Sequence, residues 1–135
     1  MKLVTYIYGI ALLALQRVDA AQPNDDEAKA ICGKLGVMDT TGMSEDAASK
    51  TRLCAEHPLG HLDPSDDLSK RRCWNGKPVG CSRGYCWHTC GGGGQWCWAA
   101  EGDGTGPWIT CKNDSQCSSI MACGAGNCKR CGCTC

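Results

Sequence analysis

The sequence predicts a small disulfide-rich protein, with a short helical N-terminal segment followed by a cysteine-dense region of short antiparallel strands and turns. Three observations support this fold class. The 135 residues include 14 cysteines, a density that is typical of disulfide scaffolds. No phenylalanine is present, so cross-links must supply stability that a larger apolar core would otherwise provide. Two cysteines precede residue 73 and the other twelve lie in residues 73–135, so the chain divides into a cysteine-poor and a cysteine-dense part.

A secretory signal peptide is predicted over residues 1–20. Lys2 is followed by an apolar-biased run over residues 3–15, and Val18 and Ala20 suit the small-residue positions before a signal-peptidase cut. The thirteen residues of this run are fewer than the roughly 20 that cross a bilayer, and no later stretch is long and apolar enough to do so. All cysteines lie beyond the cut, so the mature chain is expected to be extracellular, oxidised and without a membrane span.

Residues 21–72 are expected to form an acidic helical segment and a linker. This part of the chain contains ten acidic and seven basic residues. Asn24 can cap a helix whose first turn is acidic, and Gly36 can end that helix. Ser44 can cap a second helix that runs to about Glu56, because Pro58 prevents its continuation.

One disulfide is predicted in this segment, between Cys32 and Cys54, where it would join the two helices. Two small apolar faces bury too little surface to offset chain entropy without such a cross-link. Residues 57–72 contain Pro58 and Pro64 and are expected to form an exposed linker. The basic cluster Lys70-Arg71-Arg72 is either a processing site, which would make residues 21–72 a propeptide, or a solvated run of charge.

Residues 73–135 are expected to form a disulfide-rich domain of short antiparallel strands. Its glycines recur at turn-like intervals, and those at 91–94 are expected to form a turn. In residues 95–99 the alternation places Trp96 and Trp98 on one face and Cys97 on the other, which is the period of a strand. Residues 108–111 are the expected hairpin partner of that strand.

The even number of cysteines predicts seven bridges, and the connectivity beyond Cys32 to Cys54 is left open. The run over residues 131–135 is expected to be extended, so that its three sulfurs project from one face to three separate partners. A metallothionein-like or zinc cluster is the rival for this spacing, and export to an oxidising compartment disfavours it. The disulfide candidates are Cys32, Cys54, Cys73, Cys81, Cys86, Cys90, Cys97, Cys111, Cys117, Cys123, Cys128, Cys131, Cys133 and Cys135.

Six aromatic residues of the second region are the candidate binding residues. They fall within a stretch of 35 residues, and a small domain cannot bury so many large rings completely. Exposed rings on a rigid scaffold can stack on sugars or anchor a protein partner. The alternative is a small core of rings packed against disulfides in place of phenylalanine. The six are Trp74, Tyr85, Trp87, Trp96, Trp98 and Trp108.

No catalytic, metal or cofactor site is predicted. The 14 basic and 14 acidic residues balance, which disfavours nucleic-acid binding. His88 has no serine, free cysteine or carboxylate pair nearby and is expected to be a surface histidine. His57 and His61 lie four apart and close to Asp63, but a proline and a glycine break any helix that would bring them together as ligands. Asn113 begins a formal glycosylation sequon, Asn-Asp-Ser.

Three sequence blocks carry a resemblance to a known family. Residues 81–90 read CSRGYCWHTC, residues 95–98 read QWCW, and residues 131–135 read CGCTC. In these blocks the chain resembles the small secreted cysteine-rich proteins of filamentous ascomycetes, including those induced during vegetative incompatibility. The likeness covers residues 73–135, and residues 54–58 more loosely. It implies a fungal, extracellular, effector-like or toxin-like protein without a known enzymatic site, and it transfers no functional residue.

A second likeness is to hevein-type chitin-binding modules. It rests on the cysteine-serine start at residues 81–82 and the glycine-aromatic-cysteine step at residues 84–86. The sequence departs from that pattern, because it lacks the adjacent cysteine pair and has a shorter spacing before Tyr85.

Two functions are therefore expected from the sequence. The first is a monomeric, non-enzymatic, secreted effector-like or toxin-like protein that binds a host or competitor molecule, with a host protein as one possible partner. The alternative is a module that binds chitin or another cell-wall glycan by stacking tryptophan and tyrosine rings on sugars.

Overall fold

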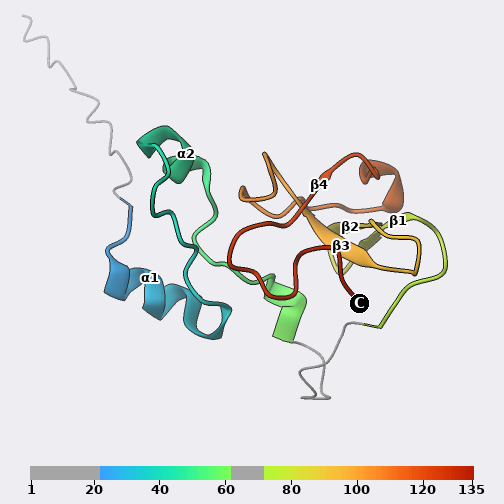
Figure 1. The fold of residues 1–135 in the computed structure, drawn as a ribbon, viewed down its shortest axis with the longest axis horizontal. Helices are drawn as coiled ribbons and strands as arrows, with labels where there is room; N and C mark the ends of the chain where they lie inside the picture. Colours follow the sequence, from blue (N-terminus) through green and yellow to red (C-terminus); the bar gives the residue numbers. More distant parts are fainter. Residues whose placement is uncertain (1–21, 62–71) are drawn as a thin grey trace, which may run out of the picture.

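A computed structural model describes residues 22–61 and 72–135 (Figure 1). The described residues contain two α-helices, α1 (Asp25–Cys32) and α2 (Glu45–Lys50), and four strands, β1 (Val79–Ser82), β2 (Tyr85–Thr89), β3 (Trp96–Ala100) and β4 (Ala122–Cys123). Short 3-10 turns cover Gly33–Leu35, Pro58–His61 and Asp114–Gln116. This is the predicted small disulfide-rich fold. The predicted signal peptide lies outside the described residues, as do Lys70 and Arg71 of the basic cluster.

Both helices begin where the sequence predicts. The side chain of Asn24 accepts a hydrogen bond from the Glu27 backbone N–H, and the hydroxyl of Ser44 accepts one from that of Ala47. Helix α1 ends at Cys32 and is followed by a 3-10 turn that Gly36 closes with a φ of 65°. These ends follow from local capping, because each cap satisfies a backbone N–H that the first turn of a helix leaves without a partner.

The predicted end of the second helix at about Glu56 is wrong, because α2 ends at Lys50. The residues after it are extended and pair with the segment that follows α1. Val37 and Cys54 form an antiparallel bridge, and the Met38 N–H donates to the Leu53 carbonyl over 2.8 Å. These tertiary hydrogen bonds take the backbone groups that a longer helix would have used.

The predicted disulfide between Cys32 and Cys54 is present, with an S–S distance of 2.00 Å. Since Cys54 lies beyond α2, the bridge joins α1 to the extended segment rather than to a second helix.

The four strands form one antiparallel sheet in the order β1-β2-β3-β4. Strands β1 and β2 are joined by a two-residue turn in which Arg83 and Gly84 have φ values of 50° and 88°. Positive φ at both positions is typical of the tight hairpin turns that match strand twist. The predicted turn at residues 91–94 joins β2 to β3.

The expected hairpin partner of β3 is confirmed in part. Trp108 bridges Ala100, and the Ile109 N–H donates to the Ala99 carbonyl over 3.0 Å. Thr110, in contrast, bridges Tyr85 of β2. Residues 108–111 therefore cross from one strand to the next instead of forming a strand of their own.

Every cysteine of the chain falls within the described ranges, and each is in a disulfide. Sulfur and small side chains make up much of the core, where Cys86 and Cys117 pack with Ala99. Disulfide-bonded cysteines thus supply part of the interior of a chain that has no phenylalanine. The bridges are Cys32–Cys54, Cys73–Cys135, Cys81–Cys111, Cys86–Cys117, Cys90–Cys133, Cys97–Cys123 and Cys128–Cys131.

The C-terminal run has three separate disulfide partners, as predicted, but not the predicted geometry. Cys131, Cys133 and Cys135 are bonded to three cysteines at different places in the chain. The backbone of this run is turned rather than extended, with Thr134 alone bridging Trp96. The three sulfurs therefore reach different partners because the backbone turns between them. They do not project from one face of an extended strand, as was predicted.

The segment before residue 62 packs on the cysteine-dense part. The buried guanidinium of Arg52 donates to the carbonyls of Gly104 and Ala125 and lies 4.1 Å from the centre of the Trp108 ring. Burial lowers the pKa of Arg52 to about 10, so it remains charged at neutral pH. The Glu56 carboxylate accepts the Lys129 N–H over 2.7 Å. These contacts join the two parts, between which there is no disulfide.

The predicted exposed linker over residues 57–72 is wrong at its first residue, because His57 is fully buried, with 0% of its surface exposed. Residues 62–71 of that linker lie outside the described ranges. Within the part of the chain that the structure describes, no helix is long and apolar enough to cross a membrane.

Candidate functional site

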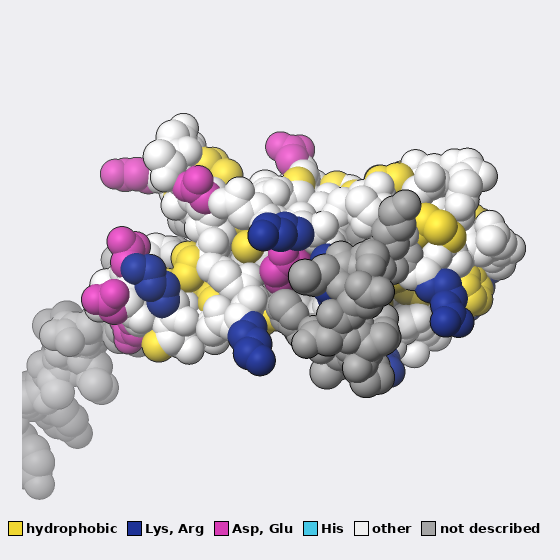
Figure 2. All heavy atoms as spheres, turned by 60° about the horizontal axis from the view of Figure 1, so that its bottom comes forward, with side chains coloured by type: hydrophobic (Ala, Val, Ile, Leu, Met, Phe, Trp, Pro, Cys, Tyr) yellow, Lys and Arg dark blue, Asp and Glu magenta, His cyan; other side chains and the backbone are white. Residues whose placement is uncertain are grey.

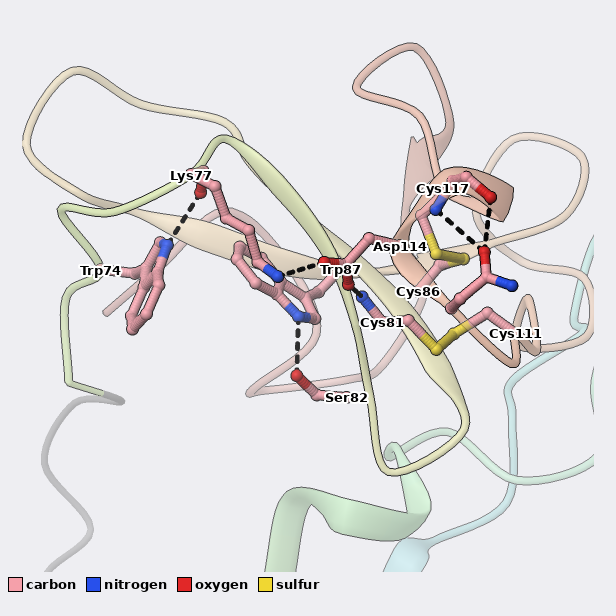
Figure 3. A network of polar contacts seen from close by, with 11 residues as sticks. Trp74, Lys77, Cys81, Ser82, Cys86, Trp87, Cys111, Asp114 and Cys117 are labelled. Atoms are coloured by element: carbon pink, nitrogen blue, oxygen red, sulfur yellow. Dashed lines mark hydrogen bonds and ion pairs between the residues drawn. A yellow bond between two sulfur atoms is a disulfide. The ribbon is translucent and has the colours of Figure 1, made fainter.

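Four tryptophans line a groove on one side of the sheet. Its volume is about 360 Å³, and Arg72, Lys77 and Ser82 complete the lining. We call this feature the tryptophan groove. Figure 3 shows two of its rings with Lys77 and Ser82. In Figure 2, most of the acidic side chains in view lie at the helical end of the molecule. The tryptophans that line the groove are Trp74, Trp87, Trp96 and Trp98.

The sheet sets the positions of three of these rings. Trp87 of β2 and Trp98 of β3 are directly opposed in the register, so both side chains lie on one face. Trp96 lies two residues before Trp98 and shares that face, as the alternation predicts. Trp74 precedes β1, and its backbone N–H donates to the Gly94 carbonyl over 2.8 Å.

Two glycines leave room for the rings. A Cβ atom at Gly76 would lie 2.5 Å from the Trp74 ring, and one at Gly80 would lie 2.6 Å from the Trp87 ring. Both distances are well below van der Waals contact, so a larger residue would push the indole away from the backbone. Glycine at these positions allows the rings to lie close to the main chain.

Hydrogen bonds within the protein fix three of the indoles. The indole N–H of Trp74 donates to the Lys77 carbonyl over 2.8 Å, and that of Trp87 donates to the Ser82 hydroxyl over 2.9 Å. The indole N–H of Trp96 donates to the Arg72 carbonyl over 3.1 Å. Because these donors are engaged, the rings offer a ligand their faces and edges.

Neighbouring rings in the groove are close to perpendicular. Trp74 and Trp87 meet at 77° with centroids 5.7 Å apart, and Trp87 and Trp96 meet at 71° and 6.2 Å. Trp96 and Trp98 meet at 84° and 5.1 Å. Such edge-to-face contacts are favourable for aromatic pairs. The rings therefore form the walls of a groove rather than a flat platform.

The six predicted binding residues are divided between the groove and a core cluster. Trp74 is 43% exposed, whereas Trp87 and Trp98 are only 7% and 8% exposed and so also belong to the interior. Tyr85 and Trp108 do not line the groove. They pack edge-on against His57, with ring centroids 4.6 and 4.7 Å from the imidazole.

Sequence reasoning did not find the core role of His57. Its imidazole is enclosed by Tyr85, Trp98 and Trp108, which come from three different parts of the cysteine-dense region. A histidine beside a proline in a polar stretch gives no signal of burial. The side chain of His61 and all of Asp63 lie outside the described residues.

The two basic side chains of the groove have different surroundings. Lys77 forms an ion pair with Asp114, which also accepts the Cys81 N–H over 2.7 Å (Figure 3). The hydrogen bonds from Lys77 and then from Cys81 hold the pKa of Asp114 below its ordinary value. This carboxylate therefore anchors Lys77 at the rim. Arg72 lines the groove beside Trp96, to whose indole its carbonyl is bonded.

The expectation that His88 is a surface residue is wrong. It is buried, and its Nε2 atom lies 3.4 Å from the Cys97 sulfur and 3.7 Å from the Cys123 sulfur. Its position on β2, opposite Cys97 in the register, turns it to the face away from the groove. Since both sulfurs are bonded to each other, they offer no thiolate to a metal ion.

Asn113 of the predicted sequon is exposed and begins a turn. Its side-chain carbonyl accepts the Ser115 N–H over 3.1 Å and so caps the 3-10 turn over Asp114–Gln116. No structural feature of the described residues tests whether it carries a glycan.

The chain matches no protein-family model. Searches of curated proteins and of solved structures return no match either. A function for this protein is therefore inferred from the groove, the disulfide framework and the sequence features.

Proposed function

We propose that this protein is a secreted, effector-like or toxin-like binding protein that recognises a host or competitor molecule with its tryptophan groove. The observation that carries the proposal is the groove itself, where four rings converge with two basic side chains. Concave, mostly apolar sites with a few polar groups are the usual form of small-ligand sites. The predicted signal peptide and the seven disulfides support secretion.

Rigidity supports a role in binding. Indole hydrogen bonds fix three of the rings, and the disulfide Cys97–Cys123 cross-links the strand that carries Trp96 and Trp98. A site whose side chains are already ordered loses less entropy when a ligand arrives. The groove is therefore suited to bind without rearrangement.

The proposal includes no catalytic step. Each cysteine is in a disulfide, so none supplies a thiol nucleophile, and His57 and His88 are both buried. A groove lined by tryptophan, arginine, lysine and serine supports recognition better than bond cleavage, because no general base faces it from the described residues.

The second candidate function is a module for chitin or another wall glycan. Tryptophan rings favour it, since they stack on sugar faces. The angles of 71° to 84° between neighbouring rings do not match a flat crystalline surface. If the ligand is a glycan, a soluble chain or a chain end fits the groove better than the face of a crystal.

The proposal is tested with the oxidised mature protein and its Trp74→Ala variant. Labelled protein is added to chitin beads and to plant and fungal cell-wall preparations, and the bound fraction is measured. Ile120→Ala is the matched control, because Ile120 is an apolar residue that is 92% exposed and does not line the groove. We expect wall binding that Trp74→Ala reduces and Ile120→Ala preserves. Equal binding by all three proteins would contradict a role for the groove.

A further inference from the structure

The polar side chains that line the tryptophan groove are hydrogen-bond donors. The side chains of Arg72 and Lys77 carry donor groups and no acceptor atom. The Ser82 hydroxyl already accepts a hydrogen bond from the Trp87 indole N–H, which leaves its own O–H as a donor. The described lining residues include no carboxylate, and with Asp114 paired to Lys77 the side chains of Arg72, Lys77 and Asp114 together carry one net positive charge. The groove is therefore complementary to a ligand that is rich in acceptors or negatively charged.

Lys77 keeps donors for a ligand although it is paired. A lysine ammonium has three N–H donors, and Asp114 is the partner that the structure gives it. Asp114 is itself fixed by the Cys81 N–H, so the pair holds the ammonium in place. Arg72 also lines the groove, and an arginine guanidinium is a planar group that suits bidentate contact with a carboxylate.

The apolar surface of the groove is presented by ring faces and edges, because the indole N–H groups of Trp74, Trp87 and Trp96 are bonded within the protein. A pyranose ring offers C–H groups that pack on such faces, and its hydroxyl and ring oxygens accept hydrogen bonds. The volume of about 360 Å³ lies at the lower end of the range of small-ligand sites and suits a few sugar units.

A peptide is less well matched to this groove. Each of its buried N–H groups is a fixed donor that needs an acceptor, and the lining side chains supply almost none. A sugar hydroxyl can instead accept from the protein and turn its hydrogen toward a neighbouring sugar oxygen or solvent. An acidic peptide could meet the two cations but would leave its backbone donors unsatisfied.

We infer that the tryptophan groove binds an acidic saccharide, with sugar faces on the tryptophans and a carboxylate at Arg72 and Lys77. The inference rests on the proposed function, because it names the ligand class of the same site. It goes beyond a general wall glycan in requiring negative charge on the sugar.

Calorimetric titration of the oxidised mature protein tests this. The probes are oligogalacturonic acid, the same oligomer fully methyl-esterified, neutral chitohexaose and a glutamate-rich peptide. The methyl ester keeps the sugars and removes the charge. We expect the acid to bind at least about tenfold more tightly than its ester, since a hydrogen bond to a charged group is stronger than one to a neutral group. Added salt should weaken binding of the acid.

Variants locate the charge contacts. Arg72→Gln and Lys77→Gln should each weaken binding of oligogalacturonic acid about tenfold, whereas Lys77→Arg should retain it. Lys34→Gln is the matched control, because Lys34 is an exposed lysine in the turn after α1 and should leave affinity unchanged. Far-UV circular dichroism and intact mass confirm that each variant is folded with seven bridges.

The outcomes separate the two proposals. Equal affinity for acid and ester, lost in Trp74→Ala, would overturn the acidic-saccharide inference and keep the groove as a binding site. Preferential binding of the glutamate-rich peptide would also overturn it. Saccharide binding that Trp74→Ala leaves unchanged would contradict both proposals, and no binding of any saccharide would overturn the inference.

Discussion

The imidazole ring of His57 lies parallel to the indole ring of Trp98, with an interplanar angle of 6° and centroids 4.2 Å apart. The two residues come from opposite sides of the change in composition at residue 73. His57 therefore belongs in sequence to the cysteine-poor part, but its ring packs in the core of the cysteine-dense part. One face of Trp98 supports this core, and the same residue lines the tryptophan groove.

Replacing His57 with alanine should destabilise the oxidised protein by about 2–4 kcal/mol, because it leaves a cavity among three aromatic rings. His57→Phe should lose less, since it keeps a ring between them. Denaturant unfolding without reductant measures the change. An unfolding midpoint for His57→Ala equal to that of the original protein would show that the ring does not stabilise the fold.

A protein cut after Arg72 should remain associated in native buffer. No disulfide crosses this position, since Cys32–Cys54 precedes it and the other six bridges follow it. His57 and the Arg52 hydrogen bonds to Gly104 and Ala125 should nevertheless hold the pieces together.

Size-exclusion chromatography of protein nicked by trypsin checks this, with and without denaturant. Co-elution in buffer and separation in denaturant without reductant are expected. Separation in buffer would show that the contacts between the two parts are too weak to hold them. Pieces that need reductant to separate would contradict the disulfide pattern.

Removing Cys128–Cys131 should cost less stability than removing Cys73–Cys135. The first bridge closes a sequence separation of 3 and the second one of 62. In the chain-entropy description, the longer loop contributes about 2–3 kcal/mol more. Double alanine variants compared by denaturant unfolding give the order, and a larger loss for the Cys128/Cys131 variant would contradict it.

Acid should weaken the fold through Asp114. Because the folded state holds this pKa below its ordinary value, the carboxylate stabilises the protein above about pH 4, and the contribution is lost as the pH falls through the lowered pKa. Asp114→Asn should therefore unfold at a lower temperature at neutral pH and show a smaller further decrease between about pH 5 and pH 2.

Thermal unfolding across this pH range provides the measurement. Asp103→Asn is the control, since Asp103 is an exposed acid in a turn. Parallel curves for Asp114→Asn and the original protein would mean that the Lys77 and Cys81 hydrogen bonds do not contribute.

Features with local causes could be predicted from the sequence. The caps at Asn24 and Ser44 depend on residues three positions away, and the shared face of Trp96 and Trp98 follows from strand alternation. The disulfide Cys32–Cys54 was predictable because no other cysteine precedes residue 73. For the groove, the sequence indicated which rings were available but not which of them would meet.

Features that depend on contacts between distant parts of the chain could not be predicted from the sequence. Helix α2 stops at Lys50 because the residues after it pair with residues 36–38. Helix propensity is a local preference and does not predict such tertiary pairing. The burial of His57 depends on rings that follow it by 28 to 51 positions, at Tyr85, Trp98 and Trp108. Twelve cysteines permit many pairings, and their order depends on the finished sheet.

The disulfide partners of the C-terminal run determine when oxidative folding can finish. Cys73 pairs with Cys135 across 62 positions, and Cys90 pairs with Cys133 across 43. Both partners lie in the last three residues, so, if the chain is exported as proposed, the thiols of Cys73 and Cys90 cannot form their native bonds until the end of the chain has entered the oxidising compartment. Any bond that they form in the meantime is non-native and must be exchanged later. Oxidative folding of an exported chain should therefore finish only after synthesis is complete, and a disulfide isomerase should accelerate it.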